Sequence, residues 1–335
     1  MLLEVKDLRV QFVTRRGVVK AVDGVSFSVE RGETLGLVGE SGSGKSVSCL
    51  ALMRLVEAPA GRIMGGSVLL EGEELLDYSE REMRQVRGGQ ISLILQDPLS
   101  SLNPAYTIGN QVAEAIRIHQ GMRGRELTDS VVEILTAVGI PQAEQRLKQY
   151  PHQMSGGMRQ RVAGAIALSC RPSLLIADEP TTSLDATVQA QYLRLLSELQ
   201  EKFQFGMIFV THDLGIVARL CDRVAVMYAG RIVETGSTRQ IFNEPAHPYA
   251  KALLATLPSL DSRKKRLLTV TGQPPIPINL PPGCSFAPRC PEVMDVCRET
   301  FPSRSSLGDQ HGVLCWLHPS PDGAPSKAAP QASHG

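Results

Sequence analysis

The segment from Gly39 to Ser46 limits what this chain can fold into more than any other part of the sequence. It follows the pattern G-x-x-x-x-G-K-S and reads Gly39-Glu40-Ser41-Gly42-Ser43-Gly44-Lys45-Ser46. The apolar residues 35–38 before it predict a buried strand, and residues 47–53 after it predict a helix. In that setting the glycines let backbone N–H groups point at phosphate oxygens, and the helix N-terminus adds its positive dipole end. We expect a nucleotide site in which Lys45 reaches the outer phosphates and the Ser46 hydroxyl ligates Mg²⁺.

Composition narrows the class of protein. The 335 residues allow one large domain with an appendage, or two domains, and 42% hydrophobic and 21% charged residues are ordinary for a globular protein. The net charge of +1 gives no electrostatic reason to expect nucleic acid or an anionic membrane surface as a partner. No run of apolar residues approaches the roughly 20 of a membrane span, and residues 1–7 lack a signal-peptide core. We therefore expect a cytosolic protein that works at a membrane only through a partner.

Residues 1–33 alternate between apolar and polar side chains. A period of two predicts half-exposed antiparallel strands, with a turn at Arg15-Arg16-Gly17, and residues 65–72 predict a further edge strand. These strands would form a small sheet beside the nucleotide core. Phe12 lies in the first strand, and its aromatic face suits stacking on adenine; a place in the core of the small sheet is the alternative.

Two adjacent acids end another predicted strand. The four apolar residues 174–177 lead directly into Asp178 and Glu179. Asp178, at the strand end, can hold the water shell of Mg²⁺. Glu179, one step further on, can polarise the attacking water. A merely solvated strand end is the alternative, but it fits poorly with an apolar run leading into the pair.

Two more polar side chains follow predicted buried strands. Gln96 comes after the strand at 91–95, and His212 comes after the strand at 206–211. Ligands of α/β folds bind at the carboxyl edge of the sheet. We therefore expect the Gln96 amide at the phosphate-binding edge and predict that His212 senses the γ-phosphate.

Between these strands, residues 99–173 have a helical period and predict a helical insertion. It contains Ser155, a good N-cap, followed by Gly156 and Gly157, whose backbone N–H groups remain approachable. This loop is a second anion-binding helix terminus, far in sequence from the first. Because one phosphate group seldom needs two such loops from one chain, we expect this one to serve a nucleotide held by another chain.

The cysteines are unevenly distributed. Cys49, Cys170 and Cys221 are isolated in apolar surroundings, which favours buried packing. The remaining four have the spacing C-x₅-C-x₆-C-x₁₇-C and are Cys284, Cys290, Cys297 and Cys315. In a cytosolic protein such a group favours metal over disulfides. A [4Fe–4S] cluster and a structural Zn²⁺ are both compatible with four thiolates.

Taken together, these motifs resemble the nucleotide-binding subunit of an ATP-binding-cassette transporter over about residues 1–240. Met154 and Met158 depart from the commonest Leu-Ser-Gly-Gly-Gln signature, but the serine and glycines that would touch phosphate are present. The motifs that carry the resemblance are Gly39 to Ser46, Gln96, Ser155-Gly156-Gly157, Asp178-Glu179, Ser183-Leu184-Asp185 and His212. The implied fold is an α/β P-loop NTPase cassette with a mixed core sheet, an antiparallel β subdomain, a helical signature subdomain and a cysteine-bearing C-terminal extension.

The resemblance implies roles for individual residues. Glu179 would be the general base, with His212 and Gln96 reporting the γ-phosphate, and Mg²⁺ would be held by Ser46, Gln96 and Asp178. ATP contacts are implied for Phe12, Gly39, Ser41, Gly42, Ser43, Gly44, Lys45, Ser46, Ser155, Gly156, Gly157 and Asp185.

The sequences Tyr150-Pro151-His152-Gln153 and Pro245-Ala246-His247-Pro248-Tyr249, with the four C-terminal cysteines, are similar to the dipeptide and oligopeptide importer subfamily. That resemblance implies a head-to-tail pair of ATPases, two transmembrane permease subunits, an extracytoplasmic peptide-binding protein and a place at the cytoplasmic face of the membrane. It favours two different ATPases in the pair and an iron–sulfur cluster at the cysteines. Nickel and glutathione are alternative cargoes in the subfamily, and a non-transport cassette ATPase is an alternative class.

The same resemblance gives an expected division of the chain. Residues 1–257 would be the ATPase domain, with the helical subdomain at about 99–173, and residues 258–318 the C-terminal extension. Residues 319–335 are small, polar and rich in proline, and we expect them to be disordered.

Overall fold

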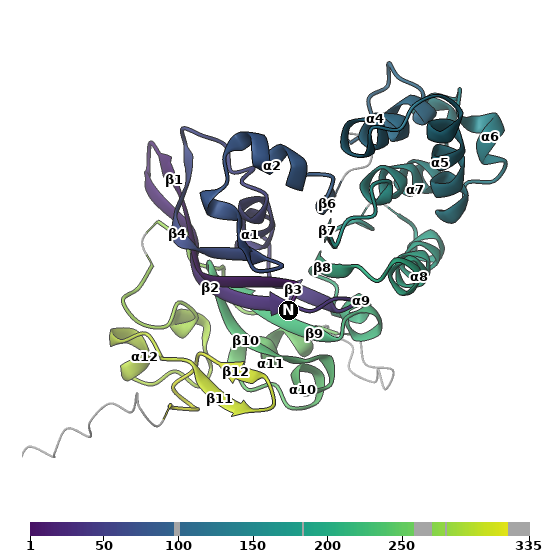
Figure 1. Ribbon diagram of the computed structural model, residues 1–335. Coiled ribbons are helices and arrows are strands. Elements are labelled where there is room, and N and C mark those ends of the chain that lie inside the picture. The colour runs from purple at the N-terminus through teal and green to yellow at the C-terminus, as the bar shows by residue number, and fades with distance from the viewer. Residues whose placement is uncertain (97–100, 183, 258–269, 279, 321–335) are drawn as a thin grey trace, which may run out of the picture.

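Two β-sheets and a lateral group of helices make up the computed structural model (Figure 1). The structure describes residues 1–96, 101–182, 184–257, 270–278 and 280–320. The smaller sheet is antiparallel, as the alternation predicted, and its strand order is β2-β1-β4-β5. Its strands are β1 (Leu3–Thr14), β2 (Gly17–Val29), β4 (Gly61–Leu70) and β5 (Glu73–Glu74). The prediction of β4 as the edge strand was wrong, because the two-residue strand β5 pairs along its outer side.

The larger sheet is mixed and has the order β11-β12-β10-β9-β3-β8-β7-β6. Its parallel strands are β6 (Ile91–Ile94), β7 (Leu174–Asp178), β8 (Gly206–Thr211), β3 (Thr34–Val38) and β9 (Arg223–Tyr228). Its antiparallel strands are β10 (Arg231–Ser237), β12 (His311–Val313) and β11 (Ser305–Gly308). The carboxyl ends of the five parallel strands meet at one edge, where ligands of α/β sheets bind.

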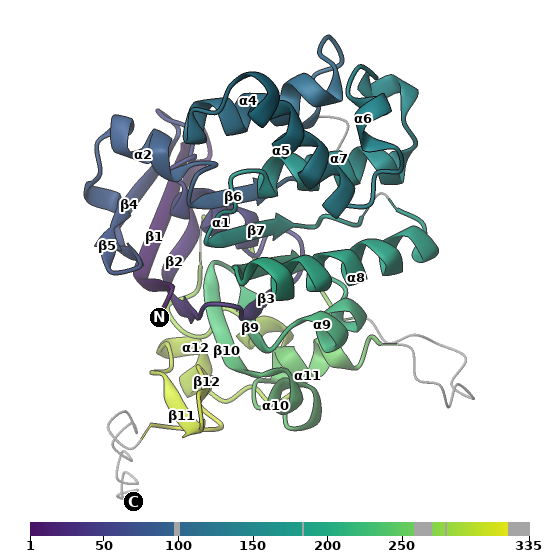
Figure 2. The same cartoon turned by 45° about the vertical axis from the view of Figure 1, so that its right-hand side comes forward.

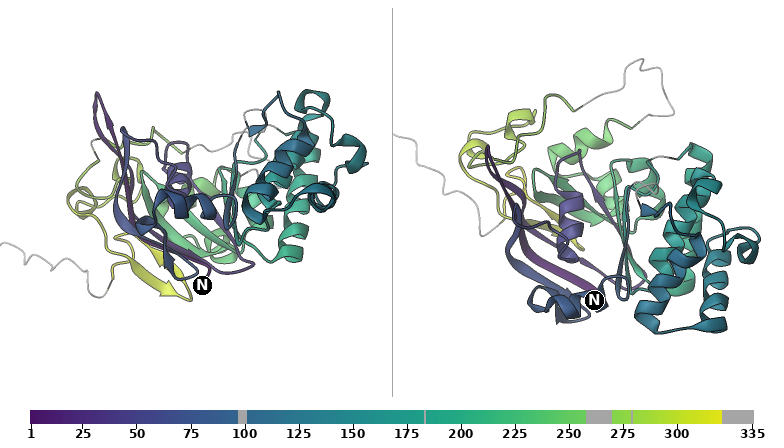
Figure 3. Two further views of the ribbon diagram at one scale, coloured as in Figure 1. Left: turned by 45° about the horizontal axis from the view of Figure 1, so that its top comes forward. Right: turned by 90° about the horizontal axis from the view of Figure 1, so that it is seen from above.

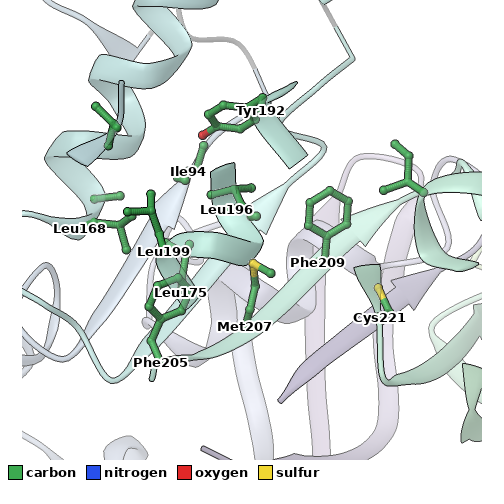
Figure 4. Close-up of a cluster of buried hydrophobic side chains, with 14 of the residues drawn as sticks. Ile94, Leu168, Leu175, Tyr192, Leu196, Leu199, Phe205, Met207, Phe209 and Cys221 are labelled. Carbon is green, nitrogen blue, oxygen red and sulfur yellow. The ribbon is translucent and has the colours of Figure 1, made fainter. Parts of the chain in front are cut away.

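The parallel strands are buried on both faces, which explains their continuous apolar runs. Leu175 and Phe209 face one hydrophobic core, and their neighbours Ile176 and Val210 face the other. Figure 4 shows the first core, where these strands pack against Leu196 and other side chains of α8 (Ala186–Phe203). The second core joins the sheet to α1 (Lys45–Leu52) and to the small antiparallel sheet. The phosphate loop, which precedes α1, therefore lies between the large sheet at Met227 and the small sheet at Ala21.

Helices between β6 and β7 form a group at one side of the sheets (Figures 1, 2 and 3). They are α4 (Ile108–Gln120), α5 (Gly124–Ala137), α6 (Ala143–Arg146) and α7 (Gly156–Leu168). Thr107 caps α4, and α5 stops before Gly139, whose φ of 76° lies in the left-handed region. The described part of residues 99–173 has no strand, in agreement with the predicted helical insertion.

Shorter helices complete the chain. They are α2 (Glu80–Val86), α9 (Leu214–Leu220), α10 (Thr238–Asn243), α11 (Pro248–Leu254) and α12 (Val296–Glu299), with 3₁₀ turns at Leu75–Asp77, Pro151–Gln153 and Ala287–Arg289. Within the described residues, no helix combines the length and the apolar character that crossing a bilayer requires. The C-terminal strands β11 and β12 lie beside β10 at the end of the large sheet (Figure 2). The predicted disordered tail, 319–335, falls almost entirely outside the described residues.

Candidate active site and a cysteine-lined cavity

The loop between β3 and α1 has a shape that only glycine permits at two positions. A Cβ atom on Gly39 would lie 2.1 Å from the Met227 carbonyl oxygen, and one on Gly44 would lie 2.3 Å from that of Ala21. Gly44 also has a φ of 103°, in the left-handed region, immediately before α1 begins at Lys45. The predicted strand, loop and helix are thus present. Ser41 and Gly42 are exposed, whereas the hydroxyl of Ser43 is buried and has no hydrogen-bond partner in the described chain.

Lys45 folds back over this loop. Its Nζ donates to the carbonyl oxygens of Gly39, at 2.8 Å, and Glu40, at 3.0 Å. Burial lowers the pKa of Lys45, and the negative charges of Glu179 and Asp178 oppose that shift. Among the described residues this buried ammonium donates to neutral carbonyl groups, and an anionic ligand would offer it a stronger partner.

Ser46 and Asp178 lie next to Lys45. Burial raises the pKa of the Asp178 carboxyl group, the nearby Ser46 hydroxyl opposes that shift, and the negative charge of Glu179 adds to it. The Oδ1 atom of Asp178 is buried and has no partner among the described residues. An unsatisfied carboxylate oxygen beside a hydroxyl group suits Mg²⁺, which prefers such oxygen ligands. The donor set therefore fits the predicted Mg²⁺ site.

The Glu179 carboxylate is the meeting point of three polar side chains. Its Oε2 accepts from Gln96 Nε2 at 3.1 Å and from Thr182 Oγ1 at 3.1 Å. Its Oε1 lies 3.2 Å from His212 Nδ1. The structure thus brings Gln96, Glu179 and His212 together, although they come from the ends of three different strands. Glu179 has a φ of 45°, and its backbone N–H donates to Val210 at 2.9 Å. This backbone bond continues the pairing of β7 and β8 and fixes where the side chain starts.

Thr182 was not among the predicted site residues. Its hydroxyl bonds both the backbone carbonyl and the side chain of Glu179. In the sequence, only its position three residues after Glu179 could have pointed to it. A threonine at that spacing indicates a contact with Glu179 only if the backbone turns between the two residues.

Phe12 lies on β1 and is half buried. Its ring packs on the second hydrophobic core, and a Cβ atom on Gly61 would lie 2.7 Å from its Cε1 atom. These contacts agree with the core alternative and leave part of the ring exposed. Stacking of Phe12 on adenine stays a prediction.

Ser155, Gly156 and Gly157 form the exposed start of α7. The Ser155 hydroxyl accepts from the Met158 N–H at 3.3 Å, as expected of an N-cap. A Cβ atom on Gly156 would meet nothing within 4 Å, whereas one on Gly157 would lie 2.9 Å from Val188. Helix α7 packs on α4, α5, α8 and β6, whereas α1 packs on β1 and β2. The second helix terminus therefore belongs to a different part of the molecule from Lys45 and opens to solvent.

Asp185 caps α8. Its Oδ1 accepts from the backbone N–H groups of Thr187 and Val188, each at 3.0 Å. Within this chain the Asp185 carboxylate thus stabilises the start of α8. Its contact with ATP stays a prediction. Ser183, part of the same motif, lies outside the described residues.

The four C-terminal cysteines line one cavity, so the structure brings together thiols up to 31 positions apart (284 to 315). All seven cysteines of the chain are free thiols. Burial raises the pKa of Cys284 and Cys290, and it raises the pKa of Cys315 to about 11. Backbone N–H groups near the sulfur atoms oppose these shifts, from Phe286 and Ala287 for Cys284 and from Leu317 for Cys315.

In the described residues, no group of three or more His, Cys, Asp or Glu side chains is arranged closely enough to hold a metal ion. A cavity lined by four thiols is nonetheless a donor set of the kind that thiophilic metals and iron–sulfur clusters use. Cys49 and Cys221, in contrast, are buried in the hydrophobic cores, as predicted, and Cys170 is partly buried.

A glycine-rich phosphate loop, a strand-end Asp-Glu pair and an inserted group of helices define an ATP-binding cassette. Residues 22–182 match the family model described as ABC transporter, and residues 233–297 match the model described as the C-terminal region of oligopeptide/dipeptide transporters. The second match ends before Cys315.

Curated relatives match almost the whole chain. The oligopeptide transport ATP-binding protein OppD of Salmonella typhimurium is 53% identical, over 90% of each chain. AppD, an oligopeptide transport ATP-binding protein of Bacillus subtilis, is 48% identical over 95% of this chain and 97% of its own. The dipeptide transport ATP-binding protein DppD of Bacillus subtilis is 48% identical over 94% of each. The chain belongs to the oligopeptide/dipeptide branch of the ABC transporter ATPases.

Solved structures agree on the fold. The dimeric bacterial ABC transporter cassette MJ0796 superposes with a TM-score of 0.63 at 26% identity, covering 71% of this chain and 99% of that one. The cbiO1 protein of Clostridium perfringens, part of the transporter complex cbiONQ, gives 0.62 at 28% identity, covering 72% and 91%. The predicted cassette with a mixed core sheet and helical parts is confirmed.

Proposed function

We propose that this chain is the ATP-hydrolysing subunit that powers import of dipeptides and oligopeptides through a membrane permease. The observation that carries the proposal is the convergence of Gln96, Thr182 and His212 on Glu179, next to the Ser46–Asp178 pair. Relatives named as peptide transport ATP-binding proteins, matched over nine-tenths of their length, support the cargo class. The subunit would act at the cytoplasmic face of the membrane.

In this proposal the phosphate loop binds ATP through its backbone N–H groups and through Lys45, which exchanges its carbonyl partners for phosphate oxygens. Ser46 and Asp178, with Gln96, would hold Mg²⁺, which neutralises charge on the phosphates when bound. Glu179 accepts a proton from the attacking water and thereby makes it a better nucleophile. Gln96 and His212 contact Glu179 directly, so a γ-phosphate that engages them also orients the base.

The ATP site would be completed by a second ATPase subunit. The exposed start of α7 at Ser155, far from this chain's own Lys45, supports a role toward a partner's nucleotide. A solved relative of the same fold is dimeric. We propose a head-to-tail pair, with two different ATPases, resting on two permease subunits that an extracytoplasmic peptide-binding protein supplies.

We further propose that Cys284, Cys290, Cys297 and Cys315 hold a [4Fe–4S] cluster, within a C-terminal extension at 258–318 that follows the ATPase domain at 1–257. The shared cavity supports the proposal, because it gathers four thiols of the kind that ligate iron–sulfur clusters. Nearby backbone N–H groups would stabilise the thiolate forms that ligation requires. Zinc is the alternative.

Transport can be tested by expressing the subunit with its partner ATPase, permease and binding protein in cells that lack peptide uptake. We expect uptake of a labelled dipeptide with the wild-type subunit and none with a Glu179→Gln subunit made in equal amount. Uptake of nickel or glutathione in place of peptide would contradict the cargo, and assembly without uptake of any of them would contradict the transport function.

The cysteine site can be tested on anaerobically purified protein. We expect brown colour, four iron and four sulfide per chain, and loss of both in a Cys290→Ser variant, since a [4Fe–4S] cluster takes four cysteine thiolates. A colourless protein with one zinc per chain would contradict the cluster.

A further inference from the structure

The ring of His247 also lines the cavity that the four cysteines share. His247 is 1% exposed and lies immediately before α11. Its Nδ1 accepts a hydrogen bond from the Tyr249 backbone N–H at 3.0 Å and so caps that helix. Its other nitrogen, Nε2, is buried and has no hydrogen-bond partner in the part of the chain that the structure describes.

The hydrogen bond to Nδ1 determines what Nε2 can do. A ring nitrogen that accepts a hydrogen bond carries no proton, so the His247 ring is neutral and its proton lies on Nε2. Nε2 is therefore a donor with no lone pair to offer a metal ion. Buried donors are almost always paired, so an unpaired one marks a place where an acceptor belongs.

The possible acceptors around the cavity are mainly sulfur atoms. Other cavity-lining side chains, Phe286 and Leu317 among them, are apolar, and Glu292 lies 3.6 Å from Lys251 in an ion pair. Anionic sulfur accepts hydrogen bonds; burial raises the pKa of Cys284 and Cys290, and nearby backbone N–H groups oppose that rise. The ring N–H of His247 would add a donor from a distant part of the sequence, 37 positions before Cys284 (247 to 284).

We propose that His247 is a fifth member of the four-cysteine site and donates its Nε2–H to a sulfur atom of the group that the cysteines bind. The assignment rests on the proposed cluster. A hydrogen bond to sulfur stabilises negative charge, and the reduced cluster has one more electron than the oxidised one. His247 therefore raises the reduction potential and slows loss of iron. It is a positioning and tuning residue, not a ligand.

A His247→Asn variant separates the two tasks of the ring. Asparagine is a favoured N-cap, so it keeps an acceptor for the Tyr249 N–H, but its short side chain lacks the distant donor. His311→Asn is the matched control, because His311 is also buried and in the C-terminal segment but bonds Glu234 at 2.9 Å and does not line the cavity. His247→Gln, whose longer amide can donate into the cavity, tests rescue.

The measurements are iron and sulfide content after anaerobic purification and the midpoint potential of the cluster in the full-length subunit. In His247→Asn we expect the reduced state to be disfavoured about tenfold, a fall of about 59 mV for a one-electron couple, with faster iron loss. His247→Gln should recover part of the potential, and His311→Asn should match the wild type. Equal potentials and iron retention in wild type and His247→Asn, with a cluster present in both, overturn this assignment alone. Wild-type protein without iron overturns the proposed cluster, and the assignment with it.

Discussion

Arg289 and Glu40 form a two-point ion pair that ties the cysteine-bearing segment to the phosphate loop. Arg289 Nη1 lies 2.6 Å from Glu40 Oε2, and Nη2 lies 2.9 Å from Oε1. The arginine side chain is 4% exposed and directly precedes Cys290. The backbone N–H of Glu40 donates to the Tyr249 hydroxyl at 2.9 Å. Both the side chain and the backbone of one phosphate-loop residue are thus held by the C-terminal part of the chain.

Replacing Arg289 with methionine should therefore weaken nucleotide binding. The change leaves the Glu40 carboxylate without its partner, and we expect about tenfold weaker MgATP binding and a loss of about 2 kcal/mol or more in the free energy of unfolding. Equilibrium binding and urea unfolding measure the two effects. A rise in the KM for ATP with little change in kcat would place the effect on binding.

Arg304→Met is the control for this prediction. Arg304 also joins the C-terminal segment to the core, where its Nη2 donates to Thr235 Oγ1 at 2.6 Å, away from the phosphate loop, although the residue itself is exposed. Its loss should lower stability and leave MgATP affinity unchanged. Combining Arg289→Met with Glu40→Gln should restore part of the stability, because no uncompensated carboxylate remains. Equal ATP affinities in all variants would show that the ion pair does not position the loop.

Glu179→Gln should keep ATP binding and lose turnover. The amide is nearly isosteric and can still bond Thr182 and Gln96, but it cannot accept the proton from water. We expect a fall in the ATPase rate of about 10² to 10⁴, with an unchanged dissociation constant for MgATP. Steady-state turnover near the wild-type rate would show that Glu179 is not the base.

Gly156→Ala should act on the paired subunits only. A methyl group at this position meets nothing within 4 Å, so stability and ATP affinity of the separate subunit should not change. If a partner's ATP lies against this loop, the methyl group blocks the approach, and turnover of the assembled pair should fall at least about tenfold, or roughly 1.4 kcal/mol in the barrier. Gly157→Ala should instead destabilise the subunit itself, through Val188. Unchanged turnover of the assembled pair with Gly156→Ala would argue against the shared site.

Asp178→Asn should stabilise the subunit without nucleotide and abolish its stabilisation by MgATP. Burial raises the pKa of Asp178, so the native state binds this proton more tightly than the unfolded chain does. The ionised group therefore costs stability at neutral pH, and this cost disappears as the pH falls through the raised pKa toward the ordinary value near 3.9. Thermal unfolding should give D178N a higher midpoint than wild type at pH 7 and a smaller advantage near pH 4. A lower midpoint at pH 7 would contradict this explanation.

The sequence predicts well what depends on local pattern. Alternation located β1 and β2, and the apolar runs before Gly39, Asp178 and His212 located three parallel strands, because each element is recorded in its own residues. The convergence of Gln96 and His212 on Glu179 also followed, since the carboxyl ends of parallel strands share an edge.

Features that depend on distant contacts did not follow. The strands β11 and β12 are short and polar, and they exist because β10 offers an edge to pair with. Arg289 and His247 lie beside sequence motifs, but their contacts with Glu40 and with the cysteine cavity arise only in the folded chain. Periodicity contains no information about such pairs.

The pairing of β12 with β10 has a consequence for biosynthesis. Strand β10 ends at Ser237, and β12 begins at His311, so a ribosome has released the whole catalytic region before the last strands of the large sheet exist. Until then the outer edge of β10 has no partner from its own chain, and open strand edges recruit other chains. The edge of β10 can be covered by its own chain only after residues 311–313 have been synthesised, so we expect nascent subunits to be prone to aggregation until then.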